Sequence, residues 1–131
     1  MMKFVGRSIH PGNVSGEALV SKSAISFFGG VDPDTGIVVE KGHELSGQSV
    51  AGKILAFPAG KGSTVGSYTL YRLKANTLAP LAILNTECEP IIAIGCIISD
   101  IPCIDQIPID KIKTGSILKI FGKQARVEIL D

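Results

Sequence analysis

One short stretch of the sequence combines the residue types that bind anions. After the apolar run Lys53–Phe57 comes Pro-Ala-Gly-Lys-Gly-Ser-Thr at 58–64, and a helical pattern follows. The unpaired N–H groups at a helix start favour negative charge, and glycines let a ligand approach the backbone closely. A phosphate or carboxylate therefore suits this loop, with Ser63 at its edge.

The loop is not a nucleotide-binding P-loop, which needs Gly-x4-Gly-Lys-Ser/Thr, because Gly62 follows Lys61. A plainer interpretation is that Ser63 or Thr64 caps the helix. Gly66 stands three residues after Ser63, where a capping box has Glu or Gln, so no capping box supports that interpretation. Anion binding and simple capping both stay open on the loop alone.

The histidines and cysteines form no metal-binding pattern. His10 precedes a proline in a turn, and we expect His43, in Lys41–Glu44, to be exposed. Neither histidine has Cys, His or carboxylate neighbours at metal-binding spacing. Cys88, Cys96 and Cys103 are spaced Cys-x7-Cys-x6-Cys, unlike the close pairs of many iron–sulfur sites. We interpret the cysteines as core residues and expect this chain to bind no metal by itself.

A second glycine-rich loop, 29–36, carries two carboxylates. Asp32 and Asp34 flank a proline, which is typical of turn-forming residues. They would lie at the mouth of a pocket only if this loop folds against residues 60–64. No Ser-His-Asp or Cys-His set is indicated, because nothing in the sequence pairs either histidine with Ser63.

The secondary structure predicted around these loops differs between the two halves of the chain. Short strands and turns come first, and a strand–helix alternation follows. The predicted strands are 3–9, 16–21, 24–28, 36–40, 53–57, 81–84 and 102–104, with a closing hairpin of 117–121 and 125–130. The predicted helices are 63–76, with Val65, Leu70, Leu73 and Tyr68 or Tyr71 on one apolar side, and Glu89 to about Ile98, which is nearly all apolar and expected to be buried. This order predicts one α/β domain, residues 1–131, with a mixed sheet or an open barrel.

Composition narrows the possible functions. The chain has 131 residues, with 13 Lys and Arg against 12 Asp and Glu, and no basic stripe that would bind nucleic acid. The longest apolar run, 91–98, is far shorter than the ~20 residues of a membrane span. The first residues lack a secretory pattern, and three cysteines fit reduced thiols, so we expect a cytoplasmic protein. Charged residues are only 19%, which suggests that another chain covers part of the surface.

Three stretches together resemble the aconitase X swivelling-domain family. They are 7–19 (RSIHPGNVSGEAL), 28–36 (FGGVDPDTG) and 60–67 (GKGSTVGS). The resemblance extends over essentially the whole chain. It implies a swivelling β/β/α fold, with an open barrel or mixed sheet and two main helices, related to the small mobile domain of aconitases.

The resemblance also implies an activity. A larger partner subunit would bind a 4Fe–4S cluster through its own cysteines. Water would be removed from (R)-5-phosphomevalonate, a small phosphorylated hydroxy acid of the archaeal mevalonate (isoprenoid) pathway, to give trans-anhydromevalonate 5-phosphate. The family's catalytic serine falls on Ser63, as the proton acceptor. We expect Lys61, Gly62, Thr64 and Gly30 to bind the substrate, and the chain alone to be inactive.

Three alternative functions are considered, and one of them is disfavoured by the sequence. Aconitase X relatives include dehydratases of hydroxyproline, so the hydroxy acid could differ. Swivelling domains that carry phosphohistidine share an opening similar to 11–18, but their histidine would fall on Val65, which disfavours that function. A non-catalytic, anion-binding scaffold subunit is the third alternative, and it follows if Ser63 is only a helix cap.

Overall fold

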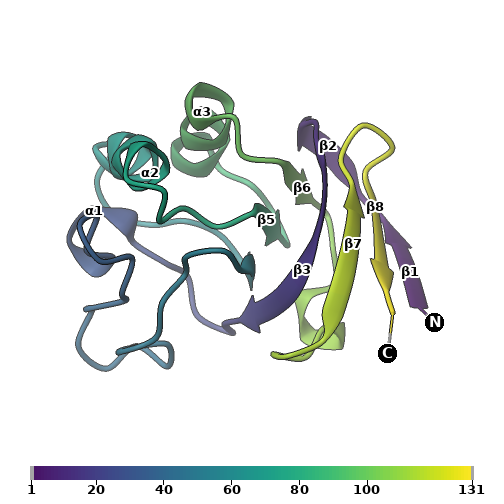
Figure 1. Cartoon of the computed structure of the whole chain (residues 1–131), viewed down its shortest axis with the longest axis horizontal. Helices are drawn as coiled ribbons and strands as arrows, with labels where there is room; N and C mark the ends of the chain where they lie inside the picture. Colours follow the sequence, from purple (N-terminus) through teal and green to yellow (C-terminus); the bar gives the residue numbers. More distant parts are fainter. Residues whose placement is uncertain (1, 131) are drawn as a thin grey trace.

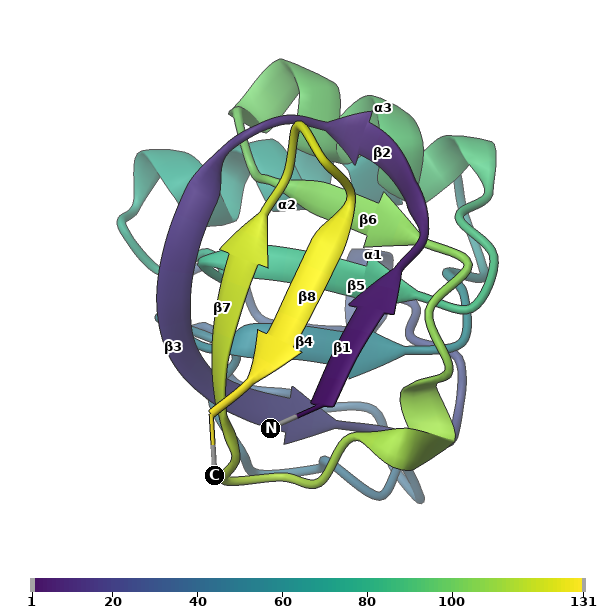
Figure 2. The same cartoon turned by 90° about the vertical axis from the view of Figure 1, so that its right-hand side faces the viewer.

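Within residues 2–130, which the computed structural model describes, eight strands form one strongly curved sheet. Its order is β1-β8-β7-β3-β4-β5-β6-β2. The strands are β1 (Met2–Val5), β2 (Arg7–His10), β3 (Asn13–Val20), β4 (Ile54–Phe57), β5 (Ala82–Asn85), β6 (Cys103–Asp105), β7 (Ile117–Phe121) and β8 (Arg126–Ile129). The strands β3 to β6 run parallel and the remaining pairs are antiparallel. The predicted mixed, barrel-like α/β architecture is therefore confirmed (Figure 2).

Gly6 joins the two edges of this sheet and nearly closes it into a barrel. The Gly6 N–H donates to the Ala125 carbonyl (2.8 Å), and a Cβ on Gly6 would lie 2.0 Å from the Asp105 carbonyl oxygen. Any side chain would therefore collide with the backbone. The predicted single strand 3–9 is wrong, because the chain there makes two strands, β1 and β2, that pair with opposite edges.

Alternating side chains on β4 divide the core in two. Ile54 and Ala56 face the barrel interior, where Leu84, Ile104, Leu118 and Val127 also lie. Leu55 and Phe57 face the helices and pack with Leu70, Leu73 and Ile92. All four β4 residues are buried, and each large side chain buried this way contributes about 1.5–3 kcal/mol.

Two main helices cover one side of the parallel strands (Figure 1). They are α2 (Gly66–Ala75) and α3 (Pro90–Ser99), and they join β4 to β5 and β5 to β6. The Glu89 carboxylate caps α3 by accepting from the N–H groups of Ile91 (2.7 Å) and Ile92 (3.2 Å). The helix predicted from Glu89 to about Ile98 is confirmed in position.

Two of the predicted short strands do not form. Residues 24–28 make only one bridge, between Ile25 and Gly60, and then enter the short helical segment α1 (Phe27–Gly30). Residues 36–40 make only isolated bridges. The backbone turns at Gly29 (φ 81°) and Gly36 (φ 76°), so neither stretch stays beside one neighbour long enough to build a ladder. A 3-10 turn, η1 (Ile109–Lys111), precedes β7.

The helices are less buried than predicted. On α2 only Leu70 and Leu73 of the predicted apolar side are buried, while Val65, just before the helix, and Tyr68 and Tyr71 are exposed. On α3 the isoleucines at 94, 97 and 98 are about half exposed, so the expectation of a buried helix is wrong. The helices form a single layer, and their outer sides are uncovered in this chain.

Candidate functional site

The glycine-rich loop follows β4 at the carboxyl end of the parallel strands. In α/β sheets this is the edge where ligands bind. The Ile25 N–H donates to the Ala59 carbonyl (3.2 Å), and the Lys61 N–H donates to the Ile25 carbonyl (3.1 Å). These bonds fix the start of the loop, and Gly62, Ser63 and Thr64 beyond it are exposed.

The helix α2 begins at Gly66, three residues later than predicted. The N–H groups of Gly66 and Ser67 donate to the carbonyls of Ser63 (2.9 Å) and Thr64 (3.2 Å), in the turn before the helix. The cap position is held by Val65, which offers no side-chain acceptor. The Ser63 Oγ nevertheless accepts from the Val65 N–H (3.1 Å), as a capping side chain does, so the interpretation of Ser63 as a cap stays open. The first-turn donors of α2 are already occupied.

The unpaired donors lie earlier, in the loop itself. Within residues 2–130, the N–H groups of Gly62, Ser63 and Thr64 have no hydrogen-bond partner. The Ser63 Oγ accepts from the Val65 N–H at 3.1 Å. Exposed amides in succession form a concavity that suits an anion, and the Val65 donor stabilises negative charge on Oγ.

The loop needs glycine at position 62. Its φ is +86°, and a Cβ there would lie 2.4 Å from the Ser26 Oγ. Both observations exclude an ordinary side chain. The backbone therefore approaches Ser26 closely, and this approach orients the peptide groups that follow.

A shallow hollow of about 410 Å³ brings three of the predicted residues together. Gly30, Lys61 and Gly62 line it. The remaining lining residues are Ser26, Phe28, Gly29 and Glu40. Ser63 and Thr64 follow Gly62 in the chain but do not line this hollow. The two glycine-rich loops therefore meet at Gly30 and Lys61.

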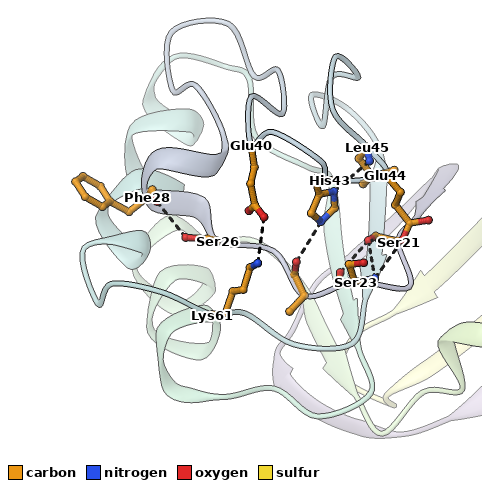
Figure 3. A network of polar contacts seen from close by, with 10 residues as sticks. Ser21, Ser23, Ser26, Phe28, Glu40, His43, Glu44, Leu45 and Lys61 are labelled. Carbon is orange, nitrogen blue, oxygen red and sulfur yellow. Dashed lines mark hydrogen bonds and ion pairs between the residues drawn. The ribbon is translucent and has the colours of Figure 1, made fainter.

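An ion pair joins the first loop to Glu40, four residues beyond the second loop. The Lys61 Nζ lies 3.1 Å from the Glu40 Oε2, and both side chains are partly exposed (Figure 3). Sequence reasoning did not select Glu40, because its partner is 21 residues away and no local motif contains both. The pair holds the amine of Lys61 at the hollow.

His43, three residues after Glu40, is buried, which contradicts the expectation that it is exposed. Its Nδ1 accepts from the Leu45 N–H (3.1 Å), so its Nε2, 3.1 Å from the Ala24 carbonyl, donates (Figure 3). This histidine is a structural group that fixes the loop. The other histidine, His10, pairs with Asp100 at 2.8 Å.

The carboxylates of the second loop form turns, as one of the two interpretations predicted. The Asp32 Oδ1 accepts from the Asp34 N–H (2.9 Å), and Asp34 pairs with Arg72 at 3.4 Å. Asp32 lines a neighbouring hollow with Phe28, not the one that contains Lys61. The alternative role at the mouth of the site is therefore not supported.

Asn85 and Cys88 make hydrogen bonds that stabilise the fold. Asn85 is fully buried, and its Nδ2 donates to the Phe57 carbonyl (2.9 Å) while its Oδ1 has no partner in the described part of the chain. The Cys88 N–H donates to the Asp105 Oδ2 (2.9 Å). Asp105 is itself paired with Arg7 through two bonds of 3.0 and 2.7 Å.

The cysteines do not fit an iron–sulfur cluster. The Sγ atoms of Cys88 and Cys103 are 3.9 Å apart, and Cys96 and Cys103 are buried. The Cys103 hydrogen bond and burial raise the pKa of the Cys88 thiol. The Cys88 hydrogen bond lowers the pKa of Cys103, but the Cys96 hydrogen bond and burial raise it overall.

Among residues 2–130, no group of three or more His, Cys, Asp or Glu side chains is arranged to hold a metal ion. In the same part of the chain, no helix has the length and hydropathy needed to cross a membrane.

The fold and the loop define the class of protein. The family model of the aconitase X swivel domain matches residues 3–129, so the chain belongs to the aconitase X swivel-domain family. The resemblance noted in the sequence is thereby confirmed.

The similar proteins have a shared name. The chain is 50% identical to the phosphomevalonate dehydratase small subunit of Methanosarcina acetivorans, over 98% of this chain and 92% of that one. It is 52% identical to the protein of the same name from Thermococcus kodakarensis, over 99% and 98%. It also matches a chain in the crystal structure of Thermococcus kodakaraensis aconitase X (holo-form), with a TM-score of 0.99, 51% identity and 100% of both chains covered.

Proposed function

We propose that this chain, residues 1–131 acting as one swivelling domain, is the small subunit of a two-subunit hydro-lyase. The enzyme dehydrates (R)-5-phosphomevalonate to trans-anhydromevalonate 5-phosphate, and Ser63 is its proton acceptor. Relatives named as phosphomevalonate dehydratase small subunits match nearly the full length. The observation that carries the serine's role is its Oγ, exposed beside free amides and receiving the Val65 N–H at 3.1 Å.

The reaction removes a proton and a hydroxyl from adjacent carbons. The Ser63 Oγ, as the alkoxide, takes the proton from the carbon next to the carboxylate. The C–H electron pair forms the new double bond, and the C–O bond breaks as the hydroxyl leaves. The larger subunit supplies the group that receives this hydroxyl, because no metal-binding group that could act as a Lewis acid lies among residues 2–130.

Ser63 needs more help than its own chain provides. A hydrogen bond to a charged acceptor contributes about 1.5–3 kcal/mol. At ~1.4 kcal/mol per factor of ten, the Val65 donor raises the alkoxide fraction roughly 10- to 150-fold. A serine hydroxyl requires much more at neutral pH, so a cation of the larger subunit must lie close to Ser63 in the complex.

The free amides bind an anionic group of the substrate. The N–H groups of Gly62, Ser63 and Thr64 are unpaired, and Lys61 lies at the adjoining hollow with Gly30. We assign these groups to the substrate's phosphate or carboxylate. We assign the 4Fe–4S cluster to the larger subunit, since no group of three or more His, Cys, Asp or Glu side chains among residues 2–130 is arranged to hold a metal ion.

The test is turnover by the reconstituted enzyme. The chain is co-purified anaerobically with its large subunit, and consumption of 5-phosphomevalonate is compared with consumption of hydroxyproline. We expect the complex to consume 5-phosphomevalonate and each subunit alone to be inactive. Turnover of hydroxyproline only would contradict the substrate. Equal turnover by the wild-type and Ser63→Ala complexes would favour the non-catalytic scaffold subunit.

A further inference from the structure

An exposed aromatic ring projects from the loop beside the candidate site. Phe28 is 53% exposed, and the backbone turns sharply after it, since Gly29 has a φ of +81°. Figure 3 shows the Phe28 ring directed away from the protein. An exposed aromatic ring becomes informative when other exposed apolar side chains lie next to it, because such patches mark interaction sites.

Further exposed apolar side chains lie on the segments that meet at Phe28, namely the segment at Val39 and the start of α2. Val39, Val65 and Tyr68 are 50%, 48% and 64% exposed. Phe28 and Val39 line one hollow together with Thr69 of α2. We call Phe28, Val39, Val65 and Tyr68 the apolar patch.

The apolar patch adjoins Ser63. Val65 belongs to it and donates its N–H to the Ser63 Oγ. The Phe28 backbone N lies 3.6 Å from the Cβ position of Gly66, at the start of α2. Phe28 also lines the hollow that contains Lys61 and Gly62. A molecule that contacts Ser63 from outside therefore meets the apolar patch as well.

We propose that the apolar patch is the surface on which the larger subunit docks, with Phe28 as the anchor that inserts into it. This inference rests on the proposed function. If Ser63 takes a proton, the group that receives the hydroxyl must come from another chain and lie within a substrate's length of Ser63. A second copy of this chain brings no such group, so it would not complete the site.

The surroundings of the patch also match a protein interface. Stable interfaces have an apolar centre, often with an aromatic anchor, and a polar rim. Here the rim contains two ion pairs, Lys61 with Glu40 and Arg72 with Asp34. Because these charges are already paired within the chain, a partner can cover them without supplying counter-charges.

The experiment measures affinity between the separately purified subunits, by titration under anaerobic conditions. We expect Phe28→Ala to weaken binding by about 30-fold or more, as for an interface hot spot. Phe28→Leu should restore part of the affinity. The matched control is Val5→Ala, because Val5 is 70% exposed on β1, far from the helices (Figure 1). Thermal unfolding of each variant checks that the fold is retained.

The possible outcomes distinguish the docking surface from the proposed function. Equal binding by wild type and Phe28→Ala would overturn the docking surface and leave the proposed function standing. No binding by wild type would overturn both. A dimer of this chain that dissociates on Phe28→Ala would make a second copy the occupant and overturn the proposal. A Ser63→Ala chain should bind like wild type, which separates docking from chemistry.

Discussion

The Ser63 Oγ accepts a hydrogen bond from the Val65 N–H at 3.1 Å, in a turn that precedes α2. A capping serine makes the same bond, so this geometry is compatible both with a cap and with a proton acceptor. The Ser63 hydroxyl is exposed, with one fixed donor and three neighbouring free amides. This placement leaves one side of the oxygen open to a substrate.

Replacing Gly62 should damage the site more than the fold. Gly62→Ala places a Cβ at φ +86° and 2.4 Å from the Ser26 Oγ, so the loop must shift. The left-handed conformation alone costs about 1–2 kcal/mol. We expect turnover by the complex to fall at least tenfold.

The matched control for that change is Gly47→Ala. Gly47 has a φ of +88°, and a Cβ there meets nothing within 4 Å. It should lower the unfolding temperature to a similar degree and leave turnover unchanged. Equal turnover losses in both variants would show that Gly62 acts only through stability.

Glu40 should restrain Lys61. In Glu40→Gln the amine of Lys61 loses its charged partner and becomes available to an anion. We expect the KM for the phosphorylated substrate to fall several-fold, and Lys61→Met to raise it. Stability should change by no more than about 1 kcal/mol, because the pair is partly exposed.

The control for Glu40 is Glu17→Gln, which breaks the Lys53–Glu17 pair (3.0 Å) between β3 and the start of β4. It should leave the KM unchanged. A rise in KM on Glu40→Gln would mean that the carboxylate itself helps to bind the substrate.

Glu44 should contribute to acid sensitivity. Burial raises its pKa, but hydrogen bonds from the Lys22 N–H, Ser21 Oγ and Ser23 N–H together lower it below the ordinary 4.5. A carboxylate with a lowered folded-state pKa stabilises the fold above its unfolded-state pKa, and this contribution is lost as the pH falls through the folded-state value.

Thermal unfolding of Glu44→Gln tests this. The variant should be less stable than wild type at pH 7, and the difference should shrink as the pH falls below about 4.5. A difference that stays constant down to pH 3 would show that the charge of Glu44 does not matter.

Asn85 should be intolerant of a charge. Asn85→Asp removes the donor to the Phe57 carbonyl and buries a carboxylate in its place. A buried group left without its partner costs about 1–3 kcal/mol, and more if charged. Burial raises the pKa of the introduced carboxyl, so the variant should recover stability relative to wild type as the pH falls.

Asn76→Asp is the control, because Asn76 is exposed and its Nδ2 donates to the Pro33 carbonyl at 2.8 Å. It should cost little at any pH. Urea unfolding of both variants at pH 7 and pH 4 checks the comparison, and similar losses in the two would contradict the role of burial.

The sequence correctly predicted those elements that are determined by residues within one helical turn. The Glu89-Pro90 pair marked the start of α3, because a carboxylate cap and an N-terminal proline act within one turn. The break at Gly6 could not be predicted, since its cause is the Asp105 carbonyl, distant in sequence. The Lys61–Glu40 pair could not be predicted for the same reason, because its two residues are 21 positions apart.

The apolar pattern also gave a wrong prediction of burial for α3, whose outer side is apolar but exposed. The helix α3 has the apolar composition of a buried helix, but its residues Ile94, Ile97 and Ile98 are about half exposed. A pattern of apolar residues does not say whether the same chain covers them. The glycines around Ser63 marked the loop correctly, but its turn before α2 depends on contacts with Ser26 and Ile25.

The most direct test of the account is the kcat of the intact complex that contains Ser63→Ala. The matched control is Ser15→Ala, an exposed serine on β3 outside the site. Affinity for the larger subunit is measured in parallel. We predict that Ser63→Ala lowers kcat at least a thousandfold, a loss of about 4 kcal/mol in transition-state stabilisation, with subunit affinity unchanged. A complex that keeps wild-type kcat without the Ser63 hydroxyl would contradict its role as the proton acceptor.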